Sequence, residues 1–282
     1  MISTDALHDP ARTRVAVIGA GHLGEAVLGG LLRAGLPAQD VAVSALPGER
    51  AQALADRYGV RAGTDNAAAA DGADIALVAV PPSVVPAAAA EIGPALPEGA
   101  VAVSLAAAVP LARFEEALGP GRPAARAMTN TAAAVGRAMT ALVGGIHLDG
   151  AARARVGGLF SRIGSIAWVG EEAMDAVTAV AGSGPGFLYH LAAAMADAAV
   201  DQGLPPGEAR AAVAQTLYGA ASLLREADRG PAELAAEVAT PGGTTREALD
   251  RLDARGVPEA VAEAVAAAAE RSRRLAEGAG HI

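Results

Sequence analysis

Two reactive side chains that many enzymes depend on are missing from this sequence. It has no cysteine, which excludes disulfides, thiol nucleophiles and thiolate metal ligands. It also has no lysine, because all 22 residues counted as lysine or arginine are arginine. Schiff-base chemistry, attachment of pyridoxal phosphate and a lysine general acid are therefore excluded.

Aromatic residues, positive charge and long apolar runs are also scarce. Aromatic side chains make up 2% of the chain and the formal net charge is −9, which argues against a nucleic-acid-binding surface. The most apolar run, Ile75 to Val80, is too short to span a bilayer, and Met1 to Arg14 lacks the apolar core of a signal peptide. The five histidines are scattered without metal-ligand spacing. We expect a soluble, cytoplasmic protein without a metal, membrane or nucleic-acid partner.

Hydrophobic residues are abundant, at 52% of the 282 residues, and this length allows one large domain or two smaller ones. Up to Gly170, short apolar runs typical of strands alternate with helical segments. The expected strands are Arg14–Ile18, Val41–Ser44, Asp74–Val80, Val101–Ser104, Ala124–Met128, Met139–Val143 and Ile166–Val169. This alternation predicts an α/β fold with a doubly wound, mostly parallel sheet.

Beyond Gly170 the pattern contains alanine-rich helical segments and no evident strand. We therefore predict two domains, a dinucleotide-binding Rossmann domain over 1–170 and an all-α domain over 171–282. The expected helix Phe187–Gln202 is apolar around much of its circumference, so it is either central to its domain or buried against another subunit. A homodimer formed through the helical domain is a reasonable hypothesis.

A glycine-rich turn follows the first expected strand. Gly19-Ala20-Gly21-His22-Leu23-Gly24 lies between that strand and a helical pattern, which is the context that the dinucleotide fingerprint requires. Gly19 allows the tight turn, Gly21 admits a pyrophosphate, and Gly24 lets helix and strand pack closely. The alternative is an ordinary turn between a strand and a helix.

The end of the second expected strand bears on the choice between NAD and NADP. An acidic residue there would bind the ribose 2′-hydroxyl of NAD, but Ser44-Ala45-Leu46 contains no acid. Ser44 and Arg50 are candidates to meet a 2′-phosphate instead, which favours NADP. Arg50 is equally compatible with a solvated position on the expected helix Pro47–Tyr58. Because ligands bind beyond the carboxyl ends of the strands, we also expect Asn66, Ala79–Pro81 and Thr129–Thr131 around the crevice.

A second glycine-rich turn lies near the C-terminus. Thr240-Pro241-Gly242-Gly243-Thr244-Thr245 breaks the preceding helix, and Leu249 and Leu252 restart a helical spacing. The first turn of a helix presents unpaired N–H groups that suit an anion such as a carboxylate. Three threonine hydroxyls are available as further donors. The alternative is a capped helix start without a ligand.

With these motifs together, the chain resembles the pyrroline-5-carboxylate reductase family over nearly its whole length. The resemblance is most specific in the last of four blocks, which are Gly19–Gly24, Arg126–Thr131, Asp175–Thr178 leading into Gly182–Pro185, and Pro231–Asp253. It implies an NAD(P)H-dependent oxidoreductase that reduces the C=N bond of 1-pyrroline-5-carboxylate to give L-proline. It further implies a Rossmann domain and a helical domain whose homodimer completes the site, with dimers that in many members form a decamer.

The resemblance also implies residue roles. Thr245 donates a hydrogen bond to the imine nitrogen, and the substrate is held by Thr240, Gly242, Gly243, Thr244 and Asn130. The cofactor, NADP or alternatively NAD, is held by Gly19, Gly21, His22, Leu23, Gly24, Ser44, Asn66, Ala79, Val80 and Pro81. No metal is implied. Such a site agrees with the chemistry, because hydride addition to an imine carbon requires a polarised or protonated nitrogen and no covalent adduct.

The sequence departs from the family pattern at several positions around the crevice. Pro81 stands where the usual motif has lysine, Thr129 and Ala132 replace prolines, Ala108 replaces glycine, Gly186 replaces alanine, and Leu46 occupies a position that is often arginine. Alternatives are therefore a six-membered or other cyclic imine, a deazaflavin donor of the F420 type, or a non-catalytic dinucleotide-binding relative. A β-hydroxyacid dehydrogenase, which combines similar domains, is disfavoured because those enzymes use a lysine.

Overall fold

The computed structural model describes residues 13–278, so His8, His281 and the segment before Thr13 lie outside the described residues. The described chain divides into two compact units. The first comprises residues 13–182 together with 269–278, and the second comprises residues 183–268.

The first unit is built on one eight-stranded sheet in the order β3-β2-β1-β4-β5-β6-β7-β8. Its strands are β1 (Val15–Ile18), β2 (Val41–Ser44), β3 (Arg61–Gly63), β4 (Ile75–Val78), β5 (Val101–Ser104), β6 (Ala124–Met128), β7 (Ala138–Gly144) and β8 (Gly164–Trp168). Neighbouring strands from β3 to β6 are parallel, β7 runs antiparallel to β6, and β8 is parallel to β7. The prediction of a doubly wound, mostly parallel sheet is confirmed.

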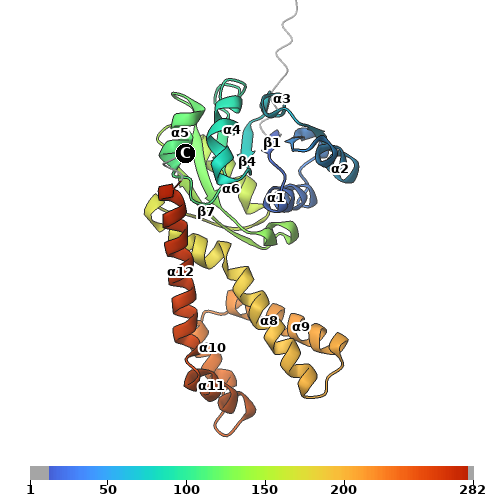
Figure 1. Cartoon of the computed structure of the whole chain (residues 1–282), viewed down its shortest axis with the longest axis vertical. Helices are drawn as coiled ribbons and strands as arrows, with labels where there is room; N and C mark the ends of the chain where they lie inside the picture. The colour runs from blue at the N-terminus through green and yellow to red at the C-terminus, as the bar shows by residue number, and fades with distance from the viewer. Residues whose placement is uncertain (1–12, 279–282) are drawn as a thin grey trace, which may run out of the picture. The chain divides into compact units, whose positions relative to one another are not determined.

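Helices cover both faces of this sheet, as Figure 1 shows. One face packs against α1 (His22–Arg33), α2 (Gly48–Tyr58) and α6 (Gly150–Ser161), and the other against α3 (Asn66–Ala70), α4 (Val85–Ile92) and α5 (Leu111–Leu118). The central strands β1, β4 and β5 are completely buried, which explains why they are continuous apolar runs rather than alternating ones.

Three features of the first unit were not anticipated. β3 and α3 were missed, because Arg61-Ala62-Gly63 has no apolar run and α3 is only five residues long. β7 is antiparallel to its neighbour β6. The connection between them, residues 129–137, contains only the 3₁₀ helix Thr131–Val135 and is too short for the crossover that parallel strands need.

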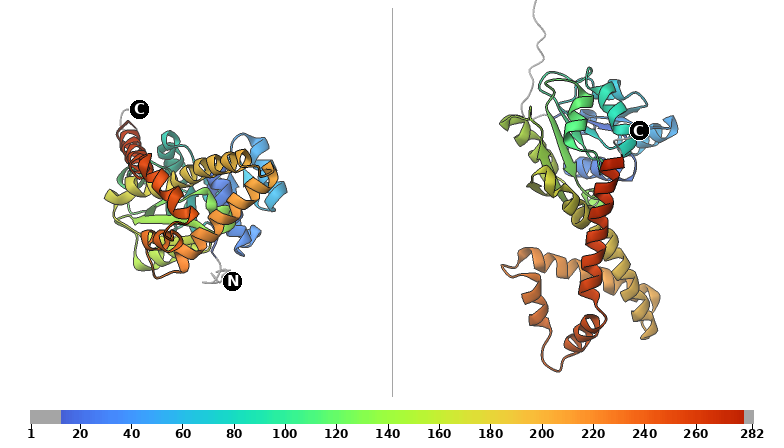
Figure 2. Two further views of the ribbon diagram at one scale, coloured as in Figure 1. Left: turned by 90° about the horizontal axis from the view of Figure 1, so that it is seen from below. Right: turned by 60° about the vertical axis from the view of Figure 1, so that its left-hand side comes forward.

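After β8 the chain passes through α7 (Met174–Val177) and a π-helical turn, Thr178–Gly182, where the first unit ends. The second unit contains α8 (Gly184–Asp201), α9 (Pro206–Glu226), α10 (Pro231–Val238), α11 (Thr244–Ala254) and the first part of α12 (Val257–Gly278). α8 packs against α9 through a tight turn at Gly203, and α10 and α11 follow as separate short helices (Figure 2). No strand occurs among the described residues after Gly170, as expected.

Two properties of the described residues bear on partners. None of the helices within residues 13–278 combines the length and hydropathy that crossing a bilayer requires. The same part of the chain holds no cluster of three or more histidine, cysteine, aspartate or glutamate side chains suited to a metal ion.

Candidate active site

The glycine-rich turn forms as the fingerprint predicts, between β1 and α1. Gly19 has φ +83°, a conformation that L side chains rarely adopt, and a Cβ there would lie 2.6 Å from Val80 Cγ1. A Cβ at Gly24 would clash with the Gly19 carbonyl oxygen. At Gly21 the space that a Cβ would fill is open, so a ligand can approach the backbone closely there.

This turn borders a cleft of about 740 Å³ at the carboxyl ends of the strands. The cleft brings together nine of the ten predicted cofactor-binding residues, namely Gly19, Gly21, His22, Leu23, Ser44, Asn66, Ala79, Val80 and Pro81. The tenth, Gly24, lies beside it and packs against Gly19. The size, the open backbone at Gly21 and the α1 N-terminus suit a dinucleotide with its pyrophosphate on the turn.

The cleft also contains residues that the motifs did not indicate. They include Thr64, Pro47, Leu105, Ala106 and Ala107. Thr64 follows β3, which was missed, so its place could not be anticipated. Ala106 and Ala107 follow β5, which was recognised, and the rule that ligands bind beyond the strand ends was sufficient to find them.

A hydrogen-bonded chain lies on the β2 side of the cleft. The Ser44 hydroxyl donates to Asn66 Oδ1 at 2.5 Å, and Asn66 Nδ2 donates to Glu91 Oε2 at 2.6 Å. Because a carboxylate only accepts, the bond to Glu91 fixes which end of the Asn66 amide faces Ser44. Both predicted cofactor residues are thus held in single orientations before a ligand enters.

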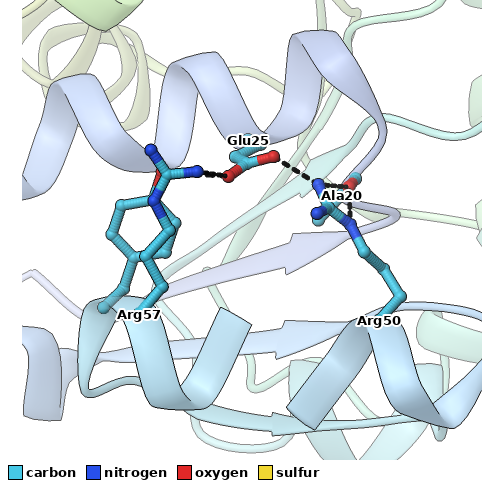
Figure 3. Close-up of polar contacts among 5 residues, drawn as sticks. Ala20, Glu25, Arg50 and Arg57 are labelled. Atoms are coloured by element: carbon cyan, nitrogen blue, oxygen red, sulfur yellow. Dashed lines mark hydrogen bonds and ion pairs between the residues drawn. The ribbon is translucent and has the colours of Figure 1, made fainter. Parts of the chain in front are cut away.

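Arg50 reaches from α2 to the glycine-rich turn. Its Nε and Nη2 donate to the Ala20 carbonyl oxygen at 3.1 and 2.9 Å, and Nη2 also pairs with Glu25. The guanidinium lines the cleft, so Arg50 is not the freely solvated side chain that was one alternative. Figure 3 shows Glu25 of α1 between Arg50 and Arg57 of α2. The Arg50 hydrogen bond, with smaller effects of Tyr58 and Arg57, holds the pKa of Glu25 below its usual value.

The loop after β6 is tied down by side-chain hydrogen bonds. Asn130 Oδ1 accepts from the Ala132 N–H at 3.1 Å, and Nδ2 donates to the Ala181 carbonyl at 2.9 Å. The buried hydroxyls of Thr129 and Thr140 bond to each other at 2.8 Å. This loop has Thr129 and Ala132 where the family pattern has prolines. The Thr129 hydroxyl and the Ala132 N–H, which prolines would not supply, help to fix it.

The turn predicted near the C-terminus forms in the second unit, and α11 begins at Thr244 as expected. Gly242 has φ +72°, and the Gly243 N–H donates to the Thr240 carbonyl at 2.9 Å. No side chain caps this helix, so the N–H groups of its first turn are available to an anion. Thr245 is half-buried, whereas Thr240 and Thr244 are exposed.

The sheet, the glycine-rich turn and the cleft define a dinucleotide-binding protein of the Rossmann class. A family model described as "Pyrroline-5-carboxylate reductase dimerisation" matches residues 171–275, and one described as "NADP oxidoreductase coenzyme F420-dependent" matches residues 14–108. A pyrroline-5-carboxylate reductase of Corynebacterium melassecola is 37% identical over 266 residues, covering 93% of this chain and 98% of the relative. The chain therefore belongs to the pyrroline-5-carboxylate reductase family, and the resemblance drawn from its motifs is confirmed.

Other relatives agree over the same length. The pyrroline-5-carboxylate reductase of Mycobacterium tuberculosis (strain ATCC 25618 / H37Rv) is 39% identical over 285 residues, covering 93% of this chain and 96% of that one. The solved pyrroline-5-carboxylate reductase of Coxiella burnetii has a TM-score of 0.85 at 27% identity, covering 93% of this chain and 98% of that chain. The fold prediction, a Rossmann domain plus a helical dimerisation domain, is therefore confirmed.

Proposed function

We propose that this chain carries out the reaction of its family, the NAD(P)H-dependent reduction of 1-pyrroline-5-carboxylate to L-proline. The membership at 37% identity over nearly the whole chain is the observation that carries this proposal. The nicotinamide, when bound, supplies a hydride to the imine carbon, and the nitrogen takes up a proton. The chain's own residues bind, orient and polarise the substrate.

Residues 240–245 are assigned to the substrate. The first turn of α11 offers N–H groups to the carboxylate, together with the hydroxyls of Thr240 and Thr244 and the backbone of Gly242 and Gly243. Thr245 donates a hydrogen bond to the imine nitrogen, which draws electron density from the C=N bond and favours hydride attack. Asn130 is also assigned to the substrate. Its amide is oriented by the bonds to Ala132 and Ala181 and keeps a second Nδ2 hydrogen for a ligand.

The cofactor end is assigned to the cleft of the first unit. The Gly19–Gly24 turn takes the pyrophosphate, Ser44, Asn66 and Arg50 lie at the adenosine ribose, and Ala79, Val80 and Pro81 lie along the wall. Because Ser44-Ala45-Leu46 offers no acid to a 2′-hydroxyl and Arg50 offers a cation to a 2′-phosphate, NADPH is the preferred donor, with NADH also accepted. Leu46 is 78% exposed and supplies no charge.

The assembly is proposed on the same grounds. The division by function is residues 1–170 for the dinucleotide and residues 171–282 for dimerisation and substrate. A homodimer formed through the helical domain completes the site, and a decamer built from such dimers is the larger assembly to look for. We also assign the protein to the cytoplasm, where its family's biosynthetic role would be carried out.

Oxidation of NADPH in the presence of pyrroline-5-carboxylate tests the assignment. Thr245→Ala is expected to lower kcat/KM about 100-fold, the usual loss when a polarising donor is removed. Ser222→Ala is the matched control, because the Ser222 hydroxyl is satisfied by the Tyr218 carbonyl at 2.8 Å, and it is expected to change kcat/KM less than about twofold. Equal losses in the two variants would remove Thr245 from the reaction.

The altered crevice motivates one comparison of substrates. Pro81, Thr129 and Ala132 depart from the family pattern, so a six-membered imine and a reduced F420 donor are tested beside pyrroline-5-carboxylate and the two nicotinamides. One extra methylene changes selectivity by only roughly 1–3 kcal/mol, so both rings are expected to react, the five-membered one faster. A protein that binds NADPH and turns over neither ring would be a non-catalytic relative.

A further inference from the structure

Glu25 lies in the first turn of α1, immediately after the glycine-rich turn. Its carboxylate contacts side chains near both ends of α2. Its Oε1 accepts from Arg57 Nη1 at 2.8 Å and from the Tyr58 hydroxyl at 3.1 Å. Its Oε2 accepts from Arg50 Nη2. Figure 3 shows the carboxylate between the two arginines, which project from α2. Glu25 itself is not among the residues that line the cleft.

The guanidinium of Arg50 is held by two acceptors. Nε and Nη2 share the Ala20 carbonyl, and the second hydrogen of Nη2 meets Glu25. Nη1 bonds to nothing within residues 13–278, so its two hydrogens are available on a side chain that is 35% exposed and lines the cleft. An arginine whose guanidinium group is already held in one orientation binds a phosphate without the entropy cost of ordering its side chain.

We propose that Glu25 is a positioning residue for cofactor selectivity, which holds the Arg50 guanidinium so that Nη1 meets the phosphate on the 2′-position of an adenosine ribose. This inference rests on the proposed use of NAD(P)H. Glu25 contacts no part of the ligand and acts through Arg50. The 2′-phosphate is a doubly charged monoester, whereas the corresponding group of NADH is a neutral hydroxyl, so the effect of Glu25 falls on NADPH alone.

Two effects of removing the Glu25 charge oppose each other. Loss of a carboxylate lowers repulsion of the incoming phosphate, but water in an open cleft and dissolved salt screen that repulsion. Without the Glu25 carboxylate, the long Arg50 side chain is free to move and must be ordered again when the phosphate binds. The ordering cost is the larger effect, so neutralising Glu25 weakens binding of the phosphorylated ligand.

The test compares the intact protein with Glu25→Gln by titration calorimetry, using 2′,5′-ADP and 5′-AMP as probes. For Glu25→Gln, the Kd of 2′,5′-ADP is expected to rise about fivefold (~1 kcal/mol), while that of 5′-AMP changes less than about twofold. The ratio of the KM for NADPH to the KM for NADH is expected to rise as well. In an Arg50→Ala background, Glu25→Gln no longer weakens 2′,5′-ADP binding.

Two further variants test whether the contact of the Glu25 carboxylate with Arg50 is the cause. Glu25→Asp retains the charge but withdraws the carboxylate from Arg50, so it is expected to show the same selective loss even if the glutamine variant does not fold. Arg57→Ala removes an ion pair from the other oxygen and is expected to leave the ratio of the two Kd values unchanged. An unchanged ratio in both Glu25 variants, or the same shift in Arg57→Ala, would overturn the proposal. Absence of turnover in the wild type would refute the proposed function alone, because the titrations need no turnover.

Discussion

The two units bury their hydrophobic residues to very different extents. In the first, the strands of the sheet are covered on both faces by two clusters of fully buried side chains. In the second, all of which the structure describes, Ala209 and Val213 are the hydrophobic residues that are buried. Leu188, Leu191 and Met195 on α8 are 54%, 45% and 46% exposed, although their spacing is that of one helix face.

This difference shows where the chain can fold by itself and where it needs a second copy. In a unit with a complete core, the burial of apolar side chains offsets the conformational entropy lost when the backbone is ordered. Helices with exposed apolar faces gain this compensation only when those faces are covered. The family model that matches residues 171–275 is a dimerisation domain. Another subunit is therefore the covering partner that we propose, and each experiment below tests one side of this comparison.

The largest effect is expected from a charge on the apolar face of α8. Leu191→Glu places a carboxylate where the proposed dimer buries an apolar side chain, so the dimer dissociation constant should rise at least about 100-fold. Light scattering at micromolar concentration should then report a monomer, and imine reduction should fall with it. Arg210→Glu adds the same side chain at an exposed position of α9 and should remain dimeric. A dimeric Leu191→Glu would mean that another surface joins the subunits.

The same contrast explains how much the sequence alone could predict. β1 and β4 were found because buried parallel strands are continuous β-branched runs, and α11 was found because Pro241 and two glycines separate it from α10. β3 was missed because an edge strand of three residues, Arg61–Gly63, has no apolar pattern. The glycine motif located the cleft, but local patterns carry no information on the fold-dependent contacts of Arg50 with Glu25 and Ala20. Those contacts join residues more than twenty positions apart.

A smaller effect, a loss of folding stability, is expected in the first unit at the pair of buried threonines. Thr140→Val leaves the Thr129 hydroxyl, which is 3% exposed, without its partner. A buried hydroxyl that loses its hydrogen bond costs about 1–3 kcal/mol. The double variant Thr129→Val with Thr140→Val removes both hydroxyls and should cost less than the single change. Urea unfolding of the two single variants, Thr129→Val and Thr140→Val, and of the double variant measures this difference, and additive losses would show that the two hydroxyls do not depend on each other.

A gain in stability is expected at Ala108, which is buried and has φ +61°. The left-handed conformation costs an L residue about 1–2 kcal/mol, whereas glycine loses about 0.4–1 kcal/mol through the greater entropy of the unfolded chain. Ala108→Gly should therefore stabilise the first unit by about 0.5 kcal/mol, seen as a higher Tm. Ala107→Gly, on the same loop, provides no relief of strain and should lower the Tm. A lower Tm in Ala108→Gly would mean that the loss of the buried methyl group outweighs the relief of strain.

The smallest effect concerns pH and the Glu25 network. The hydrogen bond from Arg50 holds the pKa of Glu25 in the folded protein below its ordinary value of 4.5. The ionised carboxylate therefore stabilises the fold fully above that value, and the contribution disappears as the pH falls through the folded pKa. The stability difference between wild type and Glu25→Gln should be below about 1 kcal/mol at neutral pH, as for other partly exposed ion pairs, and should shrink below about pH 4.5. Because Glu25 lies on α1 in the first unit and the proposed dimer forms through the helical domain, subunit association in Glu25→Gln should match the wild type over the same range. A difference in stability that stays constant from pH 7 to pH 3 would mean that the Glu25 charge does not hold α2 against α1.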